Sequence, residues 1–269
     1  MARQMSRRSR WFQRSRGSVR LIVALSLALA SIVRSVEAAP LPEILDRGHL
    51  VVAVKDNLRP LGFRDEAGQL QGLEIDIARQ LAWEILGDAD AVVFEPVSNL
   101  DRLSVVIEDE VDIAIARVTQ TRSRERLVHF SLPYYLDGTA IVTRHPEVRQ
   151  LSDLNRLRIA VLEGSSTVPV IRYTIPTAQF VAVADYQEAL ATLEADRADA
   201  FAADLSVLTG WVQEYPHYTL LSETLSTEPL CVVMPKGLQY DELRRQVNAA
   251  IARWRADGWL AERAAYWGL

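Results

Sequence analysis

The chain has 269 residues, and its 35 acidic residues outnumber its 30 lysines and arginines, which gives a formal net charge of −5 at pH 7. A chain of this length can bury a sizeable core, and its acidic balance argues against nucleic acid or an anionic membrane surface as a partner. Cys231 is the only cysteine, which excludes an intramolecular disulfide, and the four histidines lack the spacing of metal ligands. We therefore expect neither a metal nor a cofactor.

The first 38 residues have the pattern of a secretory signal peptide. Eight arginines and one glutamate accompany an apolar run at residues 21–33, and the segment ends in Val36-Glu37-Ala38, which suits cleavage. The run is short for a membrane span, although an uncleaved membrane anchor is the alternative. Without these residues 22 basic and 34 acidic residues remain, a net charge of −12. The pattern predicts an exported, soluble protein.

From residue 50 onward, short apolar runs alternate with helical periodicity. Residues 50–54 (LVVAV) predict a buried strand, residues 55–72 an irregular segment, and residues 73–86 a helix with an apolar face. Later strands are predicted at residues 91–94, 112–118, 138–143, 158–162, 179–183, 200–203 and 230–234. Later helices are predicted at residues 100–107, 186–195, 205–215, 240–256 and 260–266, and residues 168–173 form a segment of unassigned type. This alternation predicts mostly parallel sheets covered by helices.

The pattern divides into two α/β runs, which predict two lobes joined by a hinge of two segments. We place lobe 1 at residues 39–133 plus 231–269 and lobe 2 at residues 139–225. The hinge segments are then residues 134–138 and 226–230. Because α/β sheets bind ligands beyond the carboxyl ends of their strands, we expect the site in the crevice between the lobes.

The segment DIAIARVTQTRSRERLVHFS, residues 112–131, crowds arginines where a buried strand ends. Thr121 is a candidate N-cap, and Arg122 and Arg124 would lie in the first turn of the helix, where the helix dipole disfavours cations. A bound carboxylate would reverse this effect, because free amides, threonine hydroxyls and a guanidinium all bind anions. An exposed arginine-rich turn is the alternative, and local physics leaves both open.

This segment resembles the signature of the type 3 periplasmic solute-binding proteins, the amino-acid receptors of ABC importers. The matching positions, without a gap, are Asp112, Ala114, Thr119, Thr121, Arg124, Phe130 and Ser131. Further motifs of the family resemble residues 60–76, RIAVLEGSST at 158–167, RADAFAAD at 197–204, MPKG at 234–237 and WG at 267–268. The resemblance extends over essentially the whole chain after residue 38.

The resemblance implies a role for five residues. Arg124 would bind the α-carboxylate of the ligand, Thr119 would support it, and Ser165 and Ser166 of lobe 2 would add donors. Asp204 would accept hydrogen bonds from the α-ammonium, and its alternative role is the N-cap of the helix that follows. The resemblance thus implies a monomeric periplasmic receptor that closes around a small amino acid and delivers it to a membrane ABC permease.

Four positions depart from the family pattern. Lys55 replaces an acidic residue, Leu58 and Asn99 replace aromatic residues that cover the ligand, and Arg117 replaces a small residue. Lys55 and Arg117 would make the pocket positive, which argues against a cationic ligand and is compatible with an acidic amino acid or another dicarboxylate. The alternative is that Arg117 pairs with Asp56, Glu74 or Glu163 and that the ligand is neutral and polar.

Two other functions are open on the same fold. A periplasmic dehydratase-like enzyme acting on a carboxylated molecule would need a general acid, for which Glu163 is the only candidate among the motifs. A sensory or channel module would carry membrane spans between or after the lobes, where this sequence has no apolar run of sufficient length. We predict a binding protein that is not an enzyme.

Overall fold

The structure is a computed structural model that describes residues 38–269, which belong to one compact unit. The predicted signal peptide lies outside the described residues, except for Ala38 at its end. Across residues 38–269, no helix combines the length and apolar character that a membrane crossing requires.

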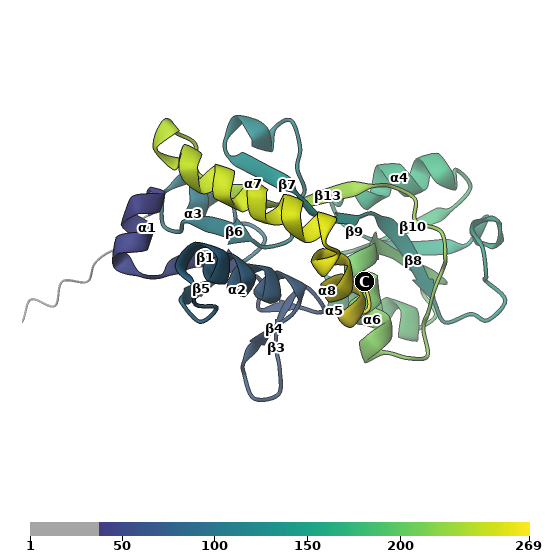
Figure 1. Ribbon diagram of the computed structural model, residues 1–269. Helices are drawn as coiled ribbons and strands as arrows, with labels where there is room; N and C mark the ends of the chain where they lie inside the picture. The colour runs from purple at the N-terminus through teal and green to yellow at the C-terminus, as the bar shows by residue number, and fades with distance from the viewer. Residues whose placement is uncertain (1–37) are drawn as a thin grey trace, which may run out of the picture. The chain divides into compact units, whose positions relative to one another are not determined.

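Two five-stranded sheets flanked by helices make up two lobes (Figure 1). The first sheet has the strand order β5-β1-β6-β13-β7 and the second has the order β10-β9-β11-β8-β12. In each sheet four strands point one way, and the fifth, β13 or β8, points the other way. The prediction of an α/β fold with two mostly parallel, helix-flanked sheets is therefore confirmed.

The strand bounds follow the predicted runs closely at most positions. In the first sheet the strands are β1 (Leu50–Val54), β5 (Val92–Pro96), β6 (Ile113–Ile115), β7 (His129–Asp137) and β13 (Glu228–Met234). In the second sheet they are β8 (Thr139–Thr143), β9 (Arg158–Leu162), β10 (Gln179–Val183), β11 (Ala200–Asp204) and β12 (Thr219–Leu220).

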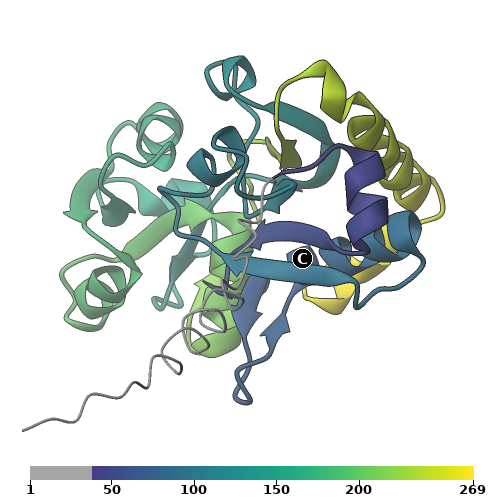
Figure 2. The same ribbon diagram turned by 90° about the vertical axis from the view of Figure 1, so that its left-hand side faces the viewer.

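Helices of both lobes cover the sheets. The α-helices are α1 (Leu41–Arg47), α2 (Leu73–Leu86), α3 (Ser104–Ile107), α4 (Thr167–Thr174), α5 (Tyr186–Glu194), α6 (Leu205–Glu214), α7 (Asp241–Ala256) and α8 (Trp259–Tyr266). Short 3₁₀ turns are η1 (Arg124–Arg126), η2 (Leu151–Leu154) and η3 (Leu238–Tyr240). In Figure 2 the teal and green helices α4 and α5 lie on the side of the second lobe away from the first, whereas the blue and yellow helices cover the first lobe. The segment of unassigned type at residues 168–173 is thus helical.

The central strands are apolar throughout because helices or loops cover both faces of each sheet. On the first sheet, one face of β1 and β6 packs with α2 and α7, and the other packs around Val106 of α3. On the second sheet, α5 and α6 cover one face and α4 the other. A strand buried on both faces has no polar alternation, which explains runs such as LVVAV at residues 50–54.

Three local predictions were wrong. Residues 55–72, expected to be irregular, contain a small antiparallel sheet of β2 (Asn57–Leu58), β3 (Gly62–Arg64) and β4 (Leu70–Gln71). Residues 129–137, which were not predicted as a strand, form β7. The helix expected after Thr121 is only the 3₁₀ turn η1.

Strands β7 and β13 connect the two lobes side by side (Figure 1). They pair in antiparallel fashion from Met234 and His129 to Glu228 and Asp137, with irregularities in the register around Cys231. Strand β8 then follows β7 into the second sheet after a single glycine, Gly138. The predicted hinge segments, residues 134–138 and 226–230, include the last four residues of β7 and the first three of β13.

The lobes also touch on the side formed by β2 and α6. A Cβ atom on Gly210 of α6 would collide with the backbone oxygen of Arg59, so the helix and the loop approach at a distance that only glycine allows. Nearby, Gln213 Nε2 donates a hydrogen bond to the backbone oxygen of Trp267 at 2.9 Å. These contacts lie beside the crevice in which most of the ligand-binding residues predicted from the sequence are found.

Candidate functional site

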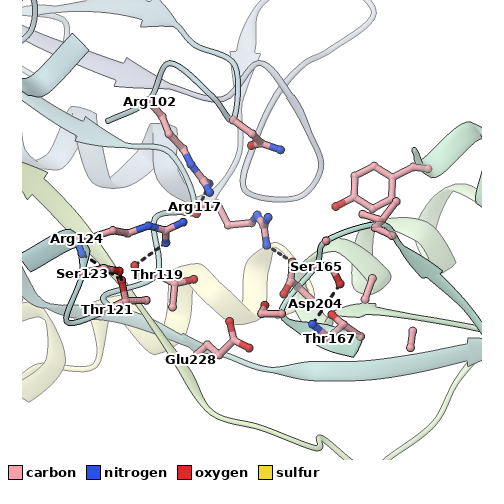
Figure 3. A pocket seen from close by; sticks show the side chains of 17 residues that line it. Arg102, Arg117, Thr119, Thr121, Ser123, Arg124, Ser165, Thr167, Asp204 and Glu228 are labelled. Atoms are coloured by element: carbon pink, nitrogen blue, oxygen red, sulfur yellow. Dashed lines mark hydrogen bonds and ion pairs between the residues drawn. The ribbon is translucent and has the colours of Figure 1, made fainter. Parts of the chain in front are cut away.

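A cavity of about 420 Å³ lies between the two lobes, and Figure 3 shows its lining from close by. Its walls come from the segments that follow β5 and β6 in the first lobe and β9 and β11 in the second, together with the start of β13. The lining residues are Asn99, Arg102, Arg117, Thr119, Thr121, Ser123, Arg124, Leu162, Gly164, Ser165, Ser166, Thr167, Tyr186, Ala202, Ala203, Asp204 and Glu228. Seven of the nine site residues predicted from the sequence are in this lining, and Lys55 and Leu58 are not.

Arg124 reaches the cavity from the 3₁₀ turn η1. Its Nη1 donates a hydrogen bond to the backbone oxygen of Thr119 at 2.8 Å. Thr121 holds the turn as the sequence suggested, because its Oγ1 accepts from the Arg124 amide at 3.4 Å and lies 3.1 Å from Ser123 Oγ. The Arg124 side chain is partly buried, and this desolvation lowers its pKa, with a further contribution from the nearby charge of Arg117.

Thr119 lies where the chain leaves β6 and runs beside β13. It forms an isolated antiparallel bridge with Leu230, and the amide of Gln120 donates to the oxygen of Pro229 at 3.1 Å. The backbone that carries Arg124 is thereby tied to β13, next to Glu228. This anchoring orients the guanidinium and threonine toward the cavity (Figure 3).

Arg117 crosses the cavity to the second lobe. Its Nη1 forms a hydrogen-bonded ion pair with Asp204 Oδ2, and the two side chains are 14% and 16% exposed (Figure 3). The alternative partners considered from the sequence were Asp56, Glu74 and Glu163; the side chain pairs with none of them, although Glu74 binds the Arg117 backbone amide. The Asp204 charge and hydrogen bond favour the protonated guanidinium, and despite the opposing effect of burial the pKa of Arg117 is raised.

Asp204 ends β11 and stands at the N-cap position of α6. Its side chain makes no capping hydrogen bond with the helix, so the ordinary capping role considered from the sequence is not realised. The carboxylate instead turns into the cavity toward Arg117. Local sequence could not reveal this pairing, because 87 positions separate the two residues.

The loop at residues 163–167 supplies the hydroxyl groups of the second lobe. Ser165 and Ser166 line the cavity, and Ser165 Oγ accepts a hydrogen bond from the amide of Thr167 at 3.2 Å. Gly164 has a φ of +69°, a left-handed conformation that lets the chain turn from β9 into α4. The loop thus presents hydroxyl groups and the first amides of α4 at one side of the cavity.

Among the lining residues that sequence reasoning missed, three carry a charged or aromatic side chain. Arg102 is 8% exposed, and its Nη1 donates to the backbone oxygens of Ala116, at 3.0 Å, and Arg117. Burial and the neighbouring arginines lower its pKa to about 10. Tyr186 adds an aromatic side chain at the start of α5, and Glu228 adds a carboxyl group from β13. The sequence gave a weak signal only for Glu228, which lies within the predicted hinge segment.

Lys55 and Leu58 are directed elsewhere. Lys55 is 4% exposed, and its Nζ donates to the backbone oxygen of Val97 at 2.7 Å. Burial, together with the charge of Arg102, lowers the pKa of Lys55. Leu58 lines a separate cavity of about 310 Å³ beside α6. Of the two positive groups predicted for the pocket, Arg117 lines the cavity and Lys55 does not, whereas Arg102, which was not predicted, adds a positive charge.

Charge in the cavity lining is unbalanced. Three arginines face two acidic residues, Asp204 and Glu228, so one positive charge is in excess when all are ionised. Burial raises the pKa of Glu228, and the nearby Asp204 and Asp137 act in the same direction. Such a lining favours an anionic group and disfavours a cationic side chain. The described residues contain no group of three or more His, Cys, Asp or Glu side chains placed to hold a metal ion.

Comparison with known proteins identifies the family. Residues 50–269 match the model of the bacterial extracellular solute-binding proteins, family 3. The chain belongs to this family. The resemblance found in the sequence is thereby confirmed, and it covers both lobes.

Family members with a named ligand include two glutamine-binding proteins. The Glutamine-binding protein of Geobacillus stearothermophilus is 32% identical over 192 residues, which are 70% of this chain and 73% of that protein. The ABC transporter glutamine-binding protein GlnH of Bacillus subtilis (strain 168) is 28% identical over 221 residues, 81% of this chain and 80% of its own. Among solved structures, a solute receptor for L-cysteine of Neisseria gonorrhoeae has a TM-score of 0.69 and 25% identity, covering 85% of this chain and 93% of its own.

Proposed function

We propose that the protein is a periplasmic receptor that binds a small amino acid between its lobes and delivers it to an ABC-type importer. The observation that carries this proposal is the cavity itself, which brings Arg124 and Thr119 of one lobe opposite Ser165, Ser166 and Asp204 of the other. Family membership and the names of the relatives support binding and delivery, and not catalysis.

Each group has a role in this proposal. Arg124 binds the ligand carboxylate, since a guanidinium fork matches two carboxylate oxygens. Thr119 and the hydroxyls of Ser165 and Ser166 donate further hydrogen bonds to the same group. Arg117 and Asn99 face the remainder of the ligand from the first lobe. The excess positive charge of the lining supports an acidic or polar ligand.

Delivery requires that the lobes open and close. We propose that residues 39–133 with 231–269 move against residues 139–225 about the segments 134–138 and 226–230. The paired strands β7 and β13 support this division, because they carry both connections between the lobes. A ligand that touches both lobes stabilises the closed arrangement, because those contacts exist only when the lobes meet.

The enzyme alternative gains no support from the site. Glu163, the general acid that such an enzyme would take from the sequence motifs, is exposed and does not line the cavity. The relatives named above are binding proteins or receptors. A receptor, acting with a membrane permease and without chemical conversion of its ligand, fits both observations.

A thermal-shift screen of the purified protein against the common L-amino acids tests the proposal. A ligand present at 100 times its dissociation constant should stabilise the protein by about 2.7 kcal/mol and raise the melting temperature. The Arg124→Ala variant should lose this shift. The Arg126→Ala variant removes the same charge from the same turn but not from the cavity lining, so it should keep the shift. The proposal fails if no amino acid raises the melting temperature, and the site assignment fails if Arg124→Ala binds as well as wild type.

A further inference from the structure

The ion pair between Arg117 and Asp204 engages the carboxylate to which the family resemblance assigns the ligand ammonium. Asp204 Oδ2 already accepts a hydrogen bond from Arg117 Nη1, and the pair spans the crevice between the lobes. An ammonium that approached Asp204 would meet a guanidinium of the same charge. The ligand would therefore have to displace Arg117 before Asp204 could bind its amino group.

Arg117 is held in place by groups that are themselves buried. Its backbone amide donates to Glu74 Oε1 at 2.6 Å, and Glu74 has no solvent exposure. Its backbone oxygen accepts from Arg102, which is 8% exposed. Its φ of +49° is a left-handed conformation that a side-chain-bearing residue rarely adopts, and here the surrounding hydrogen bonds impose it. The local structure thus fixes the backbone from which the Arg117 guanidinium reaches Asp204.

Unsatisfied donors lie beside this pair. Arg117 Nε and Arg102 Nε are buried and have no hydrogen-bond partner within residues 38–269. Arg124 binds the oxygen of Thr119 through Nη1 and lines the same cavity. A buried donor without an acceptor is costly, and a carboxylate is the acceptor that suits a guanidinium best. Arg117 and Arg102 line the same cavity as Arg124, so it offers one guanidinium for a first carboxylate and two further cationic groups for another.

We propose that Arg117 takes the place of a ligand ammonium at Asp204, so that the cavity binds small dicarboxylates whether or not they carry an α-amino group. One carboxylate binds Arg124 and Thr119, and the other binds on the side of Arg117 and Arg102. This inference rests on the proposed function, since it takes the same cavity as the ligand site. It deepens that function by naming the ligand class and the residue that sets it.

Isothermal titration with matched ligand pairs tests the inference. L-glutamate and glutarate differ only by the α-amino group, and so do L-aspartate and succinate. We expect the two members of the pair that binds to have dissociation constants within about fivefold of each other. In a site where Asp204 reads the ammonium, loss of that buried charge pair would weaken binding by more than about 30-fold.

The Arg117→Gly variant is the decisive second measurement. Glycine adopts a φ of +49° readily, so the substitution removes the guanidinium without straining the backbone. It frees Asp204, and we expect the variant to prefer L-glutamate to glutarate by at least tenfold. Arg126→Ala, which changes a charge outside the cavity lining, should leave the ratio of the two dissociation constants unchanged.

The outcomes separate this inference from the proposed function. If L-glutamate or L-aspartate binds wild type more than about 30-fold more tightly than its des-amino partner, the inference is wrong and the receptor function stands. If only neutral or cationic amino acids bind, the dicarboxylate class is wrong and the receptor function again stands. If glutarate or succinate binds while no amino acid does, the amino-acid function is wrong, and the inference is wrong too, because it expects both members of a matched pair to bind. If no compound of either class binds, both are wrong.

Discussion

Glu74 is a fully buried carboxyl group at the start of α2, directly behind the cavity. Its Oε1 accepts hydrogen bonds from the Tyr134 hydroxyl and from the Arg117 amide, each at 2.6 Å. Its Oε2 has no partner among the described residues. Burial raises the pKa of Glu74 from 4.5 to about 7, although the two hydrogen bonds and the nearby arginines oppose this rise. The position of Arg117 and the stability of the first lobe are therefore linked to the charge of one side chain.

We predict that Glu74→Gln removes a pH dependence from the stability of the protein. The folded state binds the Glu74 proton more tightly than the unfolded state, so Glu74 favours folding below pH 4.5, and this contribution is lost as the pH rises through about 7. The gap between 4.5 and about 7, at about 1.4 kcal/mol per pH unit, corresponds to about 3 kcal/mol, most of which is lost between pH 5 and pH 8. Glutamine keeps the accepting oxygen and cannot ionise. The variant should therefore gain about 2–3 kcal/mol of unfolding free energy relative to wild type between these pH values.

Urea unfolding followed by tryptophan fluorescence at pH 5, 6, 7 and 8 measures this difference. The other titrating groups are common to both proteins and cancel when the two unfolding free energies are subtracted. Glu242→Gln is the matched control, because Glu242 is also the second residue of a helix, α7, but is exposed. We expect this control to follow wild type at every pH. Parallel curves for Glu74→Gln and wild type would refute the assignment of a raised pKa to Glu74.

Three further changes test the surroundings of the cavity. Tyr134→Phe removes a hydrogen bond to Glu74, and such a bond to a charged group contributes about 1.5–3 kcal/mol. Urea unfolding should therefore show a larger loss of unfolding free energy at pH 8, where Glu74 is ionised, than at pH 5, and an equal loss at both pH values would contradict this prediction. Gly210→Leu inserts a side chain against the backbone of Arg59, where the two lobes meet, and should hinder their closure. Calorimetric titration should then show at least tenfold weaker ligand binding, with an unchanged circular dichroism spectrum. An unaltered affinity would exclude closure through this contact. Asp137→Asn places an amide where a buried carboxylate accepts three hydrogen bonds. We expect urea unfolding to show a loss of about 1–3 kcal/mol of unfolding free energy. An unchanged unfolding free energy would show that these hydrogen bonds do not contribute to stability.

The sequence predicted elements well wherever the local pattern alone determines them. The apolar runs of β1 and β9 and the helical periodicity of α2 and α7 were placed within a residue or so of their bounds. Strand β7 was missed because its sequence, HFSLPYYLD, contains a proline and no clear alternation. Its pairing with β13, about 100 positions away in the chain, is what makes it a strand. Pairing of this kind is not encoded in a short window of sequence.

The candidate site, like the fold, could be predicted only where local sequence motifs determine it. The positions of Arg124, Thr119 and the serine loop follow from motifs at fixed spacing, and all of them line one cavity. The ion pair of Arg117 does not follow from such motifs, because its partner, Asp204, lies in the other lobe and the lobes meet only after folding. Lys55 was misplaced for a related reason. Its position at the end of β1 was predicted, but a nearby backbone oxygen of Val97 competes for its ammonium.

The strength of the Arg117–Asp204 pair also bears on how the proposed receptor closes. The two side chains are only 14% and 16% exposed, and a largely buried ion pair adds little net stability, because the cost of desolvating both charges offsets much of their attraction. Moving a two-state equilibrium from 1:99 to 99:1 takes about 5.5 kcal/mol, so this pair cannot hold the lobes closed by itself. The ligand must provide most of the difference, through carboxylate contacts with donors of both lobes. If the proposed ligand site is right, Arg117 acts on the choice of ligand more than on closure, and its replacement by glycine should change selectivity while a bound ligand still closes the lobes.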